Sequence, residues 1–193
     1  MINLNVVSRI ADDKNSFPNL VEILHLLKND GITDVHMLFI GAIYSNQVYQ
    51  NILDLAGKLG VSSNISFTKT SIPLQELPDE IKNGYFINFT IGQFTGYSGL
   101  EGIKNGFKTI LYNVDKTLEN EPLNLITHCR TTDELIALIK AIRANQIKLD
   151  EEIIFCNQQV INGFTLDLPS AQKLLDMMLP GELTNYQKLR RVN

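Results

Sequence analysis

The stretch "YFINFTIGQFTGYSGLEGIKNGFKTILYN", residues 85–113, has two apolar segments of strand length separated by a glycine-containing segment of helix length. The pattern predicts strands over residues 85–90 and 108–113 and a short helix over residues 98–105. Along the rest of the chain, apolar segments of strand length also alternate with amphipathic segments of helix length. Such a regular alternation indicates an α/β domain with a parallel sheet.

The segments outside this stretch complete the expected domain. We expect further strands over residues 4–10, 35–41, 64–67 and 123–128. We expect helices over residues 17–31, 46–60 and 132–146, a short helix or turn over 74–84, and mostly helix over 150–193. Together they predict a Rossmann-like, doubly wound parallel sheet of about six strands, with helices on both faces and a helical C-terminal tail. We expect residues 1–193 to form one domain, with its core over 1–150 and its tail over 151–193.

The composition of the chain argues against several classes of protein. Its 193 residues are 44% hydrophobic and 20% charged, which suits a folded domain with an ordinary core. The net charge of −4 argues against general nucleic-acid binding, which favours a basic domain. No apolar segment approaches the roughly 20 residues of a transmembrane segment, and the N-terminus lacks the pattern of a signal peptide.

The two cysteines and the charged C-terminus bear on where in the cell the protein is found. Cys129 and Cys156 are too few for a disulfide framework and fit the thiols of a reducing compartment, so we expect a cytoplasmic protein. Peripheral contact with the membrane surface is an alternative, because Lys188, Arg190 and Arg191 gather near the C-terminus. The same three cations are also typical of a solvated helix end. No group of Cys and His residues has metal-ligand spacing, so we expect no metal site.

The short helix over residues 98–105 contains two glycines, each of which costs roughly 1 kcal/mol relative to alanine inside a helix. Ser98 and Glu101 have the Ser-x-x-Glu spacing of a capping box, which predicts the helix start. That structural role does not account for Gly96, Gly99 and Gly102. Small residues at a helix start let a ligand approach the free backbone N–H groups, which form an anion site together with the helix dipole. We therefore expect a phosphate site at this loop.

Two cations follow the first expected strand. Arg9 and Lys14 are five residues apart, and a forked guanidinium with a mobile ammonium suits two linked phosphates. Ligands of open parallel sheets bind beyond the carboxyl ends of the strands, so this loop and the glycine-containing loop should lie on the same edge. Two alternatives are that both are solvated surface cations and that Lys14 pairs with Asp12 or Asp13.

Several motifs occur in a fixed order between residue 4 and about residue 114. They are Ser8-Arg9-Ile10 followed by Lys14, an apolar strand ending at Gly41, a short strand ending at Phe67, "QFTGYSGLEG" (93–102), and "GFKTIL" (106–111). In order and spacing they resemble the C-terminal, donor-binding half of a GT-B glycosyltransferase. The resemblance is to the retaining, group 1 or family 4 type, which has a Glu-x7-Glu signature. Gln93 and Glu101 align with the two signature positions.

The resemblance implies roles for particular residues. Those with catalytic roles would be Arg9 and Lys14, on the donor's pyrophosphate, and Gln93, on the transferred sugar. Those that bind substrate would be Thr68 and Lys69 beside the base, the backbone of Gly96, Tyr97, Ser98, Gly99 and Leu100 on the phosphates and sugar, and Glu101 on the ribose hydroxyls. The chain departs from the family at Gln93, which lacks the negative charge of glutamate. It also departs at Asp115-Lys116, where the family often has two glycines.

The resemblance further implies an enzyme of the hexosyltransferase type that acts in glycan or polysaccharide biosynthesis. It would need no cofactor and would take a nucleotide-diphosphate sugar of the UDP or GDP type as donor. The family's N-terminal acceptor-binding domain has no counterpart in the sequence. A glycan or lipid-linked acceptor would therefore need a second domain or a partner. Two alternatives are a non-catalytic nucleotide-sugar-binding or assembly module, and an unrelated doubly wound domain that binds another phosphate ligand.

Overall fold

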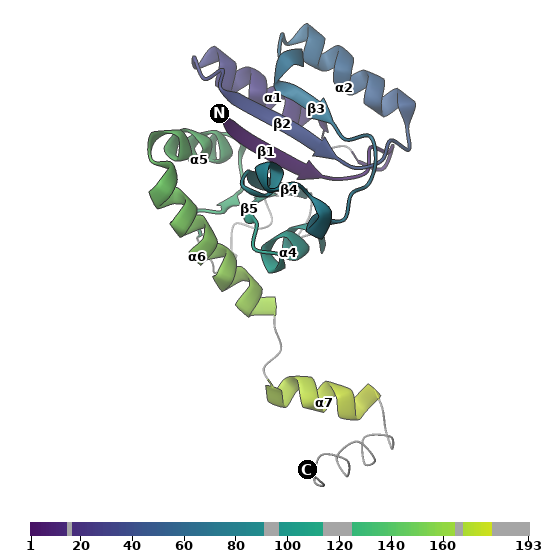
Figure 1. Ribbon diagram of the computed structural model, residues 1–193, viewed down its shortest axis with the longest axis vertical. Helices are drawn as coiled ribbons and strands as arrows, with labels where there is room; N and C mark the ends of the chain where they lie inside the picture. The colour runs from purple at the N-terminus through teal and green to yellow at the C-terminus, as the bar shows by residue number, and fades with distance from the viewer. Residues whose placement is uncertain (15–16, 91–96, 114–124, 165–167, 179–193) are drawn as a thin grey trace. The chain divides into compact units, whose positions relative to one another are not determined.

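The computed structural model describes residues 1–14, 17–90, 97–113, 125–164 and 168–178 (Figure 1). The chain forms two compact units, Met1–Gln159 and Val160–Asn193. The first unit contains the whole sheet. No helix within the described ranges is long and apolar enough to cross a membrane.

The first unit is built on a six-stranded, all-parallel sheet in the order β3-β2-β1-β4-β5-β6. The strands are β1 (Ile2–Val7), β2 (Val35–Ile40), β3 (Ile65–Phe67), β4 (Tyr85–Thr90), β5 (Lys108–Asn113) and β6 (His128–Cys129). The strand order reverses between the central strands β1 and β4, as in a doubly wound fold. The predicted fold class is therefore confirmed, and β4 and β5 have the bounds expected from the sequence.

Helices cover both faces of the sheet. The first unit contains α1 (Phe17–Asn29), α2 (Asn46–Lys58), α3 (Asp79–Lys82), α4 (Tyr97–Lys104), α5 (Thr132–Ala144) and most of α6 (Gln146–Phe164). The second unit contains α7 (Leu168–Met178). Buried side chains of α1, α2 and α5 pack with Leu4, Met37 and Ile87 in one large apolar core. A smaller core around Phe86 and Phe107 fills the opposite face, where α4 lies (Figure 1).

The expected ends of several elements are confirmed, and two expected strands have the wrong extent. Of residues 125–128, within the strand expected over 123–128, only His128 is in a strand, because β6 begins there. Gly31 and Gly60 follow α1 and α2 with φ of +76° and +68°, the left-handed conformation that glycine favours after a helix. The strand expected over residues 4–10 stops at Val7. Beyond it the backbone runs beside the loop after β2, because the N–H of Ile10 donates to the carbonyl of Ala42 (2.9 Å).

The loops after β1 and β2 pack tightly against each other. The N–H of Ser8 donates to Ile40 (3.0 Å), and the N–H groups of Tyr44 and Ser45 donate to the carbonyl of Ile10 (2.8 and 3.0 Å). A side chain at Gly41 would place its Cβ only 2.2 Å from the carbonyl oxygen of Ser8. Glycine at this position therefore permits the close approach of the two loops.

The two glycines of α4 face the sheet. A Cβ on Gly99 would lie 2.7 Å from Cγ of Asn88 on β4, and one on Gly102 would lie 3.1 Å from Oγ1 of Thr109 on β5. Both glycines are buried, so they bring α4 close to the strands. This close packing on the sheet accounts for both glycines without a ligand, and the expected access of a ligand to the backbone here stays a prediction. Gly96 lies outside the described residues.

Polar side chains of α6 hold it to the starts of β4 and β5. Asp150 accepts hydrogen bonds from Oη of Tyr85 (2.6 Å) and Nζ of Lys108 (2.9 Å). The buried side chain of Asn157 bonds both the N–H (2.8 Å) and the carbonyl (2.7 Å) of Thr109. Burial, followed by the hydrogen bond to Asp150, raises the pKa of Tyr85.

Candidate functional site

A cleft of about 370 Å³ opens at the carboxyl ends of β1 and β4, where the strand order reverses. It is lined by Val6, Val7, Ser8, Arg9, Lys14, Ile87, Asn88, Phe89, Thr90, Tyr97 and Ser98. Ligands of doubly wound sheets bind in the crevice at this reversal. The volume is within the range of about 300–1,000 Å³ that is typical of small-molecule sites. The cleft is therefore the candidate site.

Both predicted cations line this cleft. Nη2 of Arg9 donates to Oδ2 of Asp13 at 2.7 Å, and both side chains are about half exposed (52% and 54%). The predicted alternative, in which Lys14 pairs with Asp12 or Asp13, is not found. Asp12 instead accepts a hydrogen bond from Oγ of Ser45 (2.8 Å), and Lys14 forms no ion pair with the described part of the chain. The ammonium of Lys14 is thus available to an anion in the cleft.

The start of α4 forms the opposite wall of the cleft. The helix begins at Tyr97, whose side chain is 84% exposed, and Ser98 is its second residue. Oγ of Ser98 donates to Oδ1 of Asn88 at 3.0 Å. The predicted capping box is therefore wrong, because the Ser98 hydroxyl is bonded to β4 instead of capping the helix. What remains of the prediction is that the first turn of α4 faces the same cleft as the two cations.

Some of the other predicted residues lie near the cleft without lining it. Gly99 is buried against β4, Leu100 is half-buried, and the exposed carboxylate of Glu101 lies one turn after Ser98 on α4. Gln93 and Gly96, which were predicted to bind the sugar and phosphates, lie outside the described residues.

Thr68 and Lys69 follow β3, two strands away from the cleft. Oγ1 of Thr68 accepts from the N–H of Gly41 (3.0 Å) and donates to the carbonyl of Thr70 (2.7 Å), so it stabilises the turn. Lys69 has a φ of +62°, and its Nζ lies 5.6 Å from the ring centre of Tyr49. The structure does not bring these two residues into the cleft with Arg9 and Lys14.

Asn88 lines the cleft but was not predicted as a site residue. It is only 8% exposed, and its Nδ2 has no hydrogen-bond partner among the described residues. In the sequence it interrupts the apolar pattern of "YFINFT" (85–90). A polar residue inside a strand that is buried on both faces is unfavourable unless it is hydrogen-bonded. This interruption is the signal that could have identified it.

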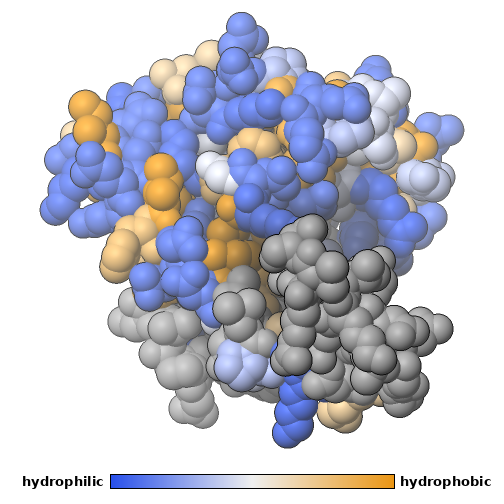
Figure 2. All heavy atoms as spheres, turned by 60° about the horizontal axis from the view of Figure 1, so that its bottom comes forward, coloured by the Kyte–Doolittle hydropathy of each residue, from blue (hydrophilic) through white to orange (hydrophobic). Residues whose placement is uncertain are grey.

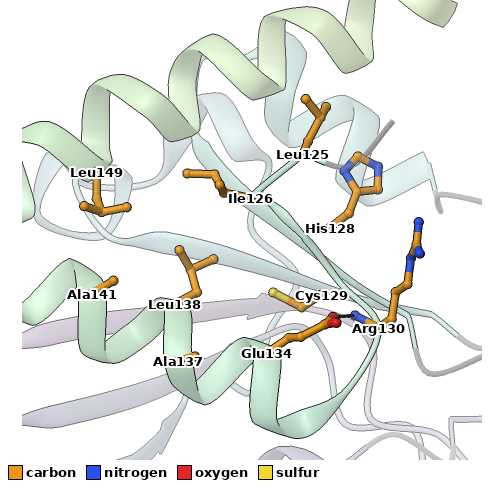
Figure 3. A pocket seen from close by; sticks show the side chains of 10 residues that line it. All are labelled: Leu125, Ile126, His128, Cys129, Arg130, Glu134, Ala137, Leu138, Ala141 and Leu149. Atoms are coloured by element: carbon orange, nitrogen blue, oxygen red, sulfur yellow. Dashed lines mark hydrogen bonds between the residues drawn. The ribbon is translucent and has the colours of Figure 1, made fainter. Parts of the chain in front are cut away.

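A second cavity, of about 400 Å³, lies between β6, α5 and the start of α6 (Figure 3). Figure 3 shows Ile126, Leu138 and Leu149 around it, with Arg130 and Glu134 at one end. Oε2 of Glu134 accepts from the backbone N–H of Arg130 at 2.6 Å. Among the described residues, none that was predicted to belong to the site lines this cavity.

The chemistry of this second cavity is limited. Burial, and then the charge of Glu134, raises the pKa of the Cys129 thiol to about 12, so the thiol stays protonated and unreactive. Across the described residues, no group of three or more His, Cys, Asp or Glu side chains could hold a metal.

The face in Figure 2 is mostly hydrophilic where it is coloured, with smaller hydrophobic areas between. The cleft at β1 and β4 therefore remains the best candidate.

Solved structures similar to this chain share its fold. The C-terminal domain of the glycosyl transferase group 1 family protein LpcC from Francisella tularensis is 12% identical, over 86% of this chain and 87% of that chain, with a TM-score of 0.61. A glycosyltransferase from Rickettsia africae is 19% identical, over 100% of this chain and 49% of that one, with a TM-score of 0.62. Anabaena HepE in complex with UDP is 13% identical, over 92% and 48%, with a TM-score of 0.64.

These solved glycosyltransferases share the fold of this chain, in agreement with the fold class predicted from the sequence. The chain spans about half the length of the Rickettsia and Anabaena proteins and most of the Francisella C-terminal domain. No protein-family model and no curated protein matches the sequence.

Proposed function

We propose that this chain is the donor-binding domain of a glycosyltransferase, and that the cleft at β1 and β4 holds the diphosphate of a nucleotide sugar. The observation that carries the proposal is that Arg9, Lys14 and the start of α4 line one cavity where the strand order reverses. The complex of Anabaena HepE with UDP, a protein of the same fold, supports a nucleoside diphosphate as ligand.

The groups in the cleft match the chemistry of transfer from a nucleotide sugar. As the bond to the sugar breaks, negative charge grows on the diphosphate, and donors already in place stabilise it. Hydrogen bonds to charged groups contribute roughly 1.5–3 kcal/mol each. Arg9 and Lys14 can supply such bonds. The first turn of α4 adds the positive end of a helix dipole.

The remaining predicted residues extend this proposal beyond the cleft. We assign the ribose hydroxyls to Glu101, because its exposed carboxylate lies one turn from Ser98 on the same side of α4. Lys69, with Thr68, would border the base, and Gln93 would contact the transferred sugar. Gly96 would offer its backbone N–H to the phosphates.

Turnover would need a second protein surface that binds the acceptor opposite the cleft. Positioning of the two reactants contributes a large share of the rate in any group transfer. We propose that a second domain or partner binds a glycan or lipid-linked acceptor opposite the cleft, in hexosyl transfer for polysaccharide biosynthesis. The test is a transfer assay with and without a matching acceptor domain. Robust turnover by this chain alone would contradict the need for a second, acceptor-binding domain.

A non-catalytic role is the second candidate, because Gln93 replaces the first glutamate of the family signature. A module that only binds nucleotide sugars would keep the cleft and lose the charged residue beside the sugar. Gln93→Glu, assayed together with an acceptor domain, separates the two: a gain of transfer from an inactive background would indicate a degenerate enzyme.

Ligand-dependent melting tests the binding proposal directly. UDP, GDP and ADP, and their sugars, are compared with NAD and FMN. A ligand at a hundred times its Kd stabilises a protein by about 2.7 kcal/mol. We expect one nucleoside diphosphate to raise the melting temperature, and Lys14→Ala to abolish the rise. Lys140→Ala is the matched control, because Lys140 pairs with Asp30 and does not line the cleft. A rise with NAD alone would favour an unrelated dinucleotide-binding domain.

A further inference from the structure

Asn88 is a buried polar residue, and only one end of its side-chain amide has a hydrogen-bond partner among the described residues. Its Oδ1 accepts the hydrogen bond from Ser98, while its Nδ2 is buried without a partner in the described part of the chain. Neighbouring positions of β4, such as Ile87 and Phe89, are apolar. A buried donor without a partner is rare and calls for an explanation.

Asn88 fits its position because residue 99 of α4, which faces the amide, is a glycine. The ideal Cβ position on Gly99 lies 2.7 Å from Cγ and 2.8 Å from Nδ2 of Asn88, so any side chain at residue 99 would displace the amide. Ser98, on the preceding position of α4, both bonds the amide and lines the cleft. Asn88, Ser98 and Gly99 thus form one packed group at the wall of the candidate site.

A second buried asparagine on the same face shows that the missing partner is not a general feature of this sheet. Asn5 on the adjacent strand β1 is 1% exposed, and its Nδ2 donates to the carbonyl of Ile81 at 2.8 Å. Asn5 lies nearer the middle of the sheet and does not line the cleft. The unpartnered amide therefore occurs at the cleft and not at the comparable position away from it.

We propose that Asn88 is a positioning residue that sets the direction of the Ser98 hydroxyl. This inference rests on the proposed function, in which the cleft holds a diphosphate. An amide carries an acceptor and a donor on one planar group, and a half-turn of the group exchanges them. In the arrangement described here, Ser98 donates to Oδ1 of Asn88, so its hydrogen is not available to a ligand.

After a half-turn, Nδ2 of Asn88 donates to Oγ of Ser98, and the hydroxyl hydrogen is free to bond a phosphate oxygen in the cleft. Each arrangement leaves one end of the amide without a partner among the described residues, so neither satisfies the whole group. A ligand that bonds Ser98 in only one of them selects that arrangement. The unpartnered Nδ2 of Asn88 is buried, so we infer that the amide acts on the ligand through Ser98.

Substitutions that fix or remove the amide distinguish the two arrangements. Asn88→Asp introduces a carboxylate, which only accepts and therefore keeps the Ser98 hydroxyl directed toward β4. Asn88→Ala removes the acceptor and leaves the hydroxyl free for the ligand. The nucleoside diphosphate among UDP, GDP and ADP that stabilises the wild type most is titrated calorimetrically into each variant. We expect about tenfold or greater loss of affinity for Asn88→Asp, and wild-type or tighter binding for Asn88→Ala.

The Ser98→Ala background separates the direction of the hydroxyl from the charge of the new carboxylate. We expect Asn88→Asp to cost clearly less affinity in that background than in the wild type. Asn5→Asp, with melting measured without ligand, controls for a buried carboxylate on the same face and for folding. An equal loss in both backgrounds, or an equal loss for Asn88→Ala and Asn88→Asp, would overturn the inference while leaving the proposed function intact. No stabilisation of the wild type by any of the three nucleotides would overturn both.

Discussion

Asp13 accepts a 2.7 Å hydrogen bond from Nη2 of Arg9, a residue that lines the cleft. The two residues are four apart in the sequence, and both remain about half exposed (52% and 54%). An ion pair of this kind is worth little, because water screens it and two mobile side chains must be ordered. The pair therefore holds the guanidinium near the cleft at small cost and can be broken or shared when an anion arrives.

Removing the carboxylate of Asp13 should strengthen nucleotide binding. Asp13→Asn frees the guanidinium of Arg9 and removes a negative charge close to the expected phosphates. The exposed pair is worth about 0.2–1 kcal/mol, so we expect the Kd for the nucleoside diphosphate to fall by a factor of about 1.4 to 5, measured by calorimetry at low salt. Asp30→Asn is the control, because Asp30 pairs with Lys140 on α5. Weaker binding in Asp13→Asn would show that Asp13 orients Arg9 instead of competing for it.

Adding a methyl group to Gly99 should destabilise the domain in spite of the better helix propensity of alanine. The new Cβ would lie 2.7 Å from Cγ of Asn88, and overpacking of this kind costs about 1–3 kcal/mol. Gly163→Ala on α6 is the matched control: a Cβ there has no neighbour within 4 Å in the described ranges, and we expect stabilisation of up to about 1 kcal/mol. Urea denaturation of both variants measures the free energy of unfolding. Equal stabilisation of both would contradict the close packing of α4 on β4.

Stability should decline in alkaline solution partly through Tyr85. Burial, and then the hydrogen bond to Asp150, raises the pKa of Tyr85 above its ordinary value of 10.0. Because the folded state holds this proton more tightly than the unfolded state, the contribution is intact below about pH 10 and is lost as the pH rises toward the folded pKa. We expect Tyr85→Phe to show a smaller loss of unfolding free energy between neutral pH and pH values above about 10. Tyr44→Phe, at a 71% exposed position, is the control. Parallel profiles for wild type and Tyr85→Phe would refute this role.

The sequence predicted the parts of the fold that depend on local chemistry. Gly31 and Gly60 marked the ends of α1 and α2, because a left-handed residue after a helix favours glycine. The apolar pattern of residues 85–90 and 108–113 gave the bounds of β4 and β5. A parallel sheet then brings all loops after strands to one edge, which is why Arg9 and the start of α4 could be expected in one cleft.

What could not be predicted depends on packing between elements. A small residue is needed both where a ligand approaches and where a helix meets a sheet, so the sequence alone could not assign Gly99 and Gly102 to the second role. The bond between Ser98 and Asn88 joins residues ten apart and exists only because α4 lies against β4. From the spacing of residues alone, Ser98 appeared to be the cap of its own helix.

The backbone that carries Arg9 is held in place before any ligand binds. The N–H of Ser8 donates to Ile40 at the end of β2, the N–H of Ile10 donates to Ala42 in the loop that follows, and Gly41 allows the two loops to touch. Freezing a flexible loop on association would cost conformational entropy for every residue ordered. In the segment after β1, ligand binding would need to order the rotatable bonds at the ends of the Arg9 and Lys14 side chains. Affinity in this cleft should thus respond more to the charges of a ligand than to any rearrangement of the main chain after β1.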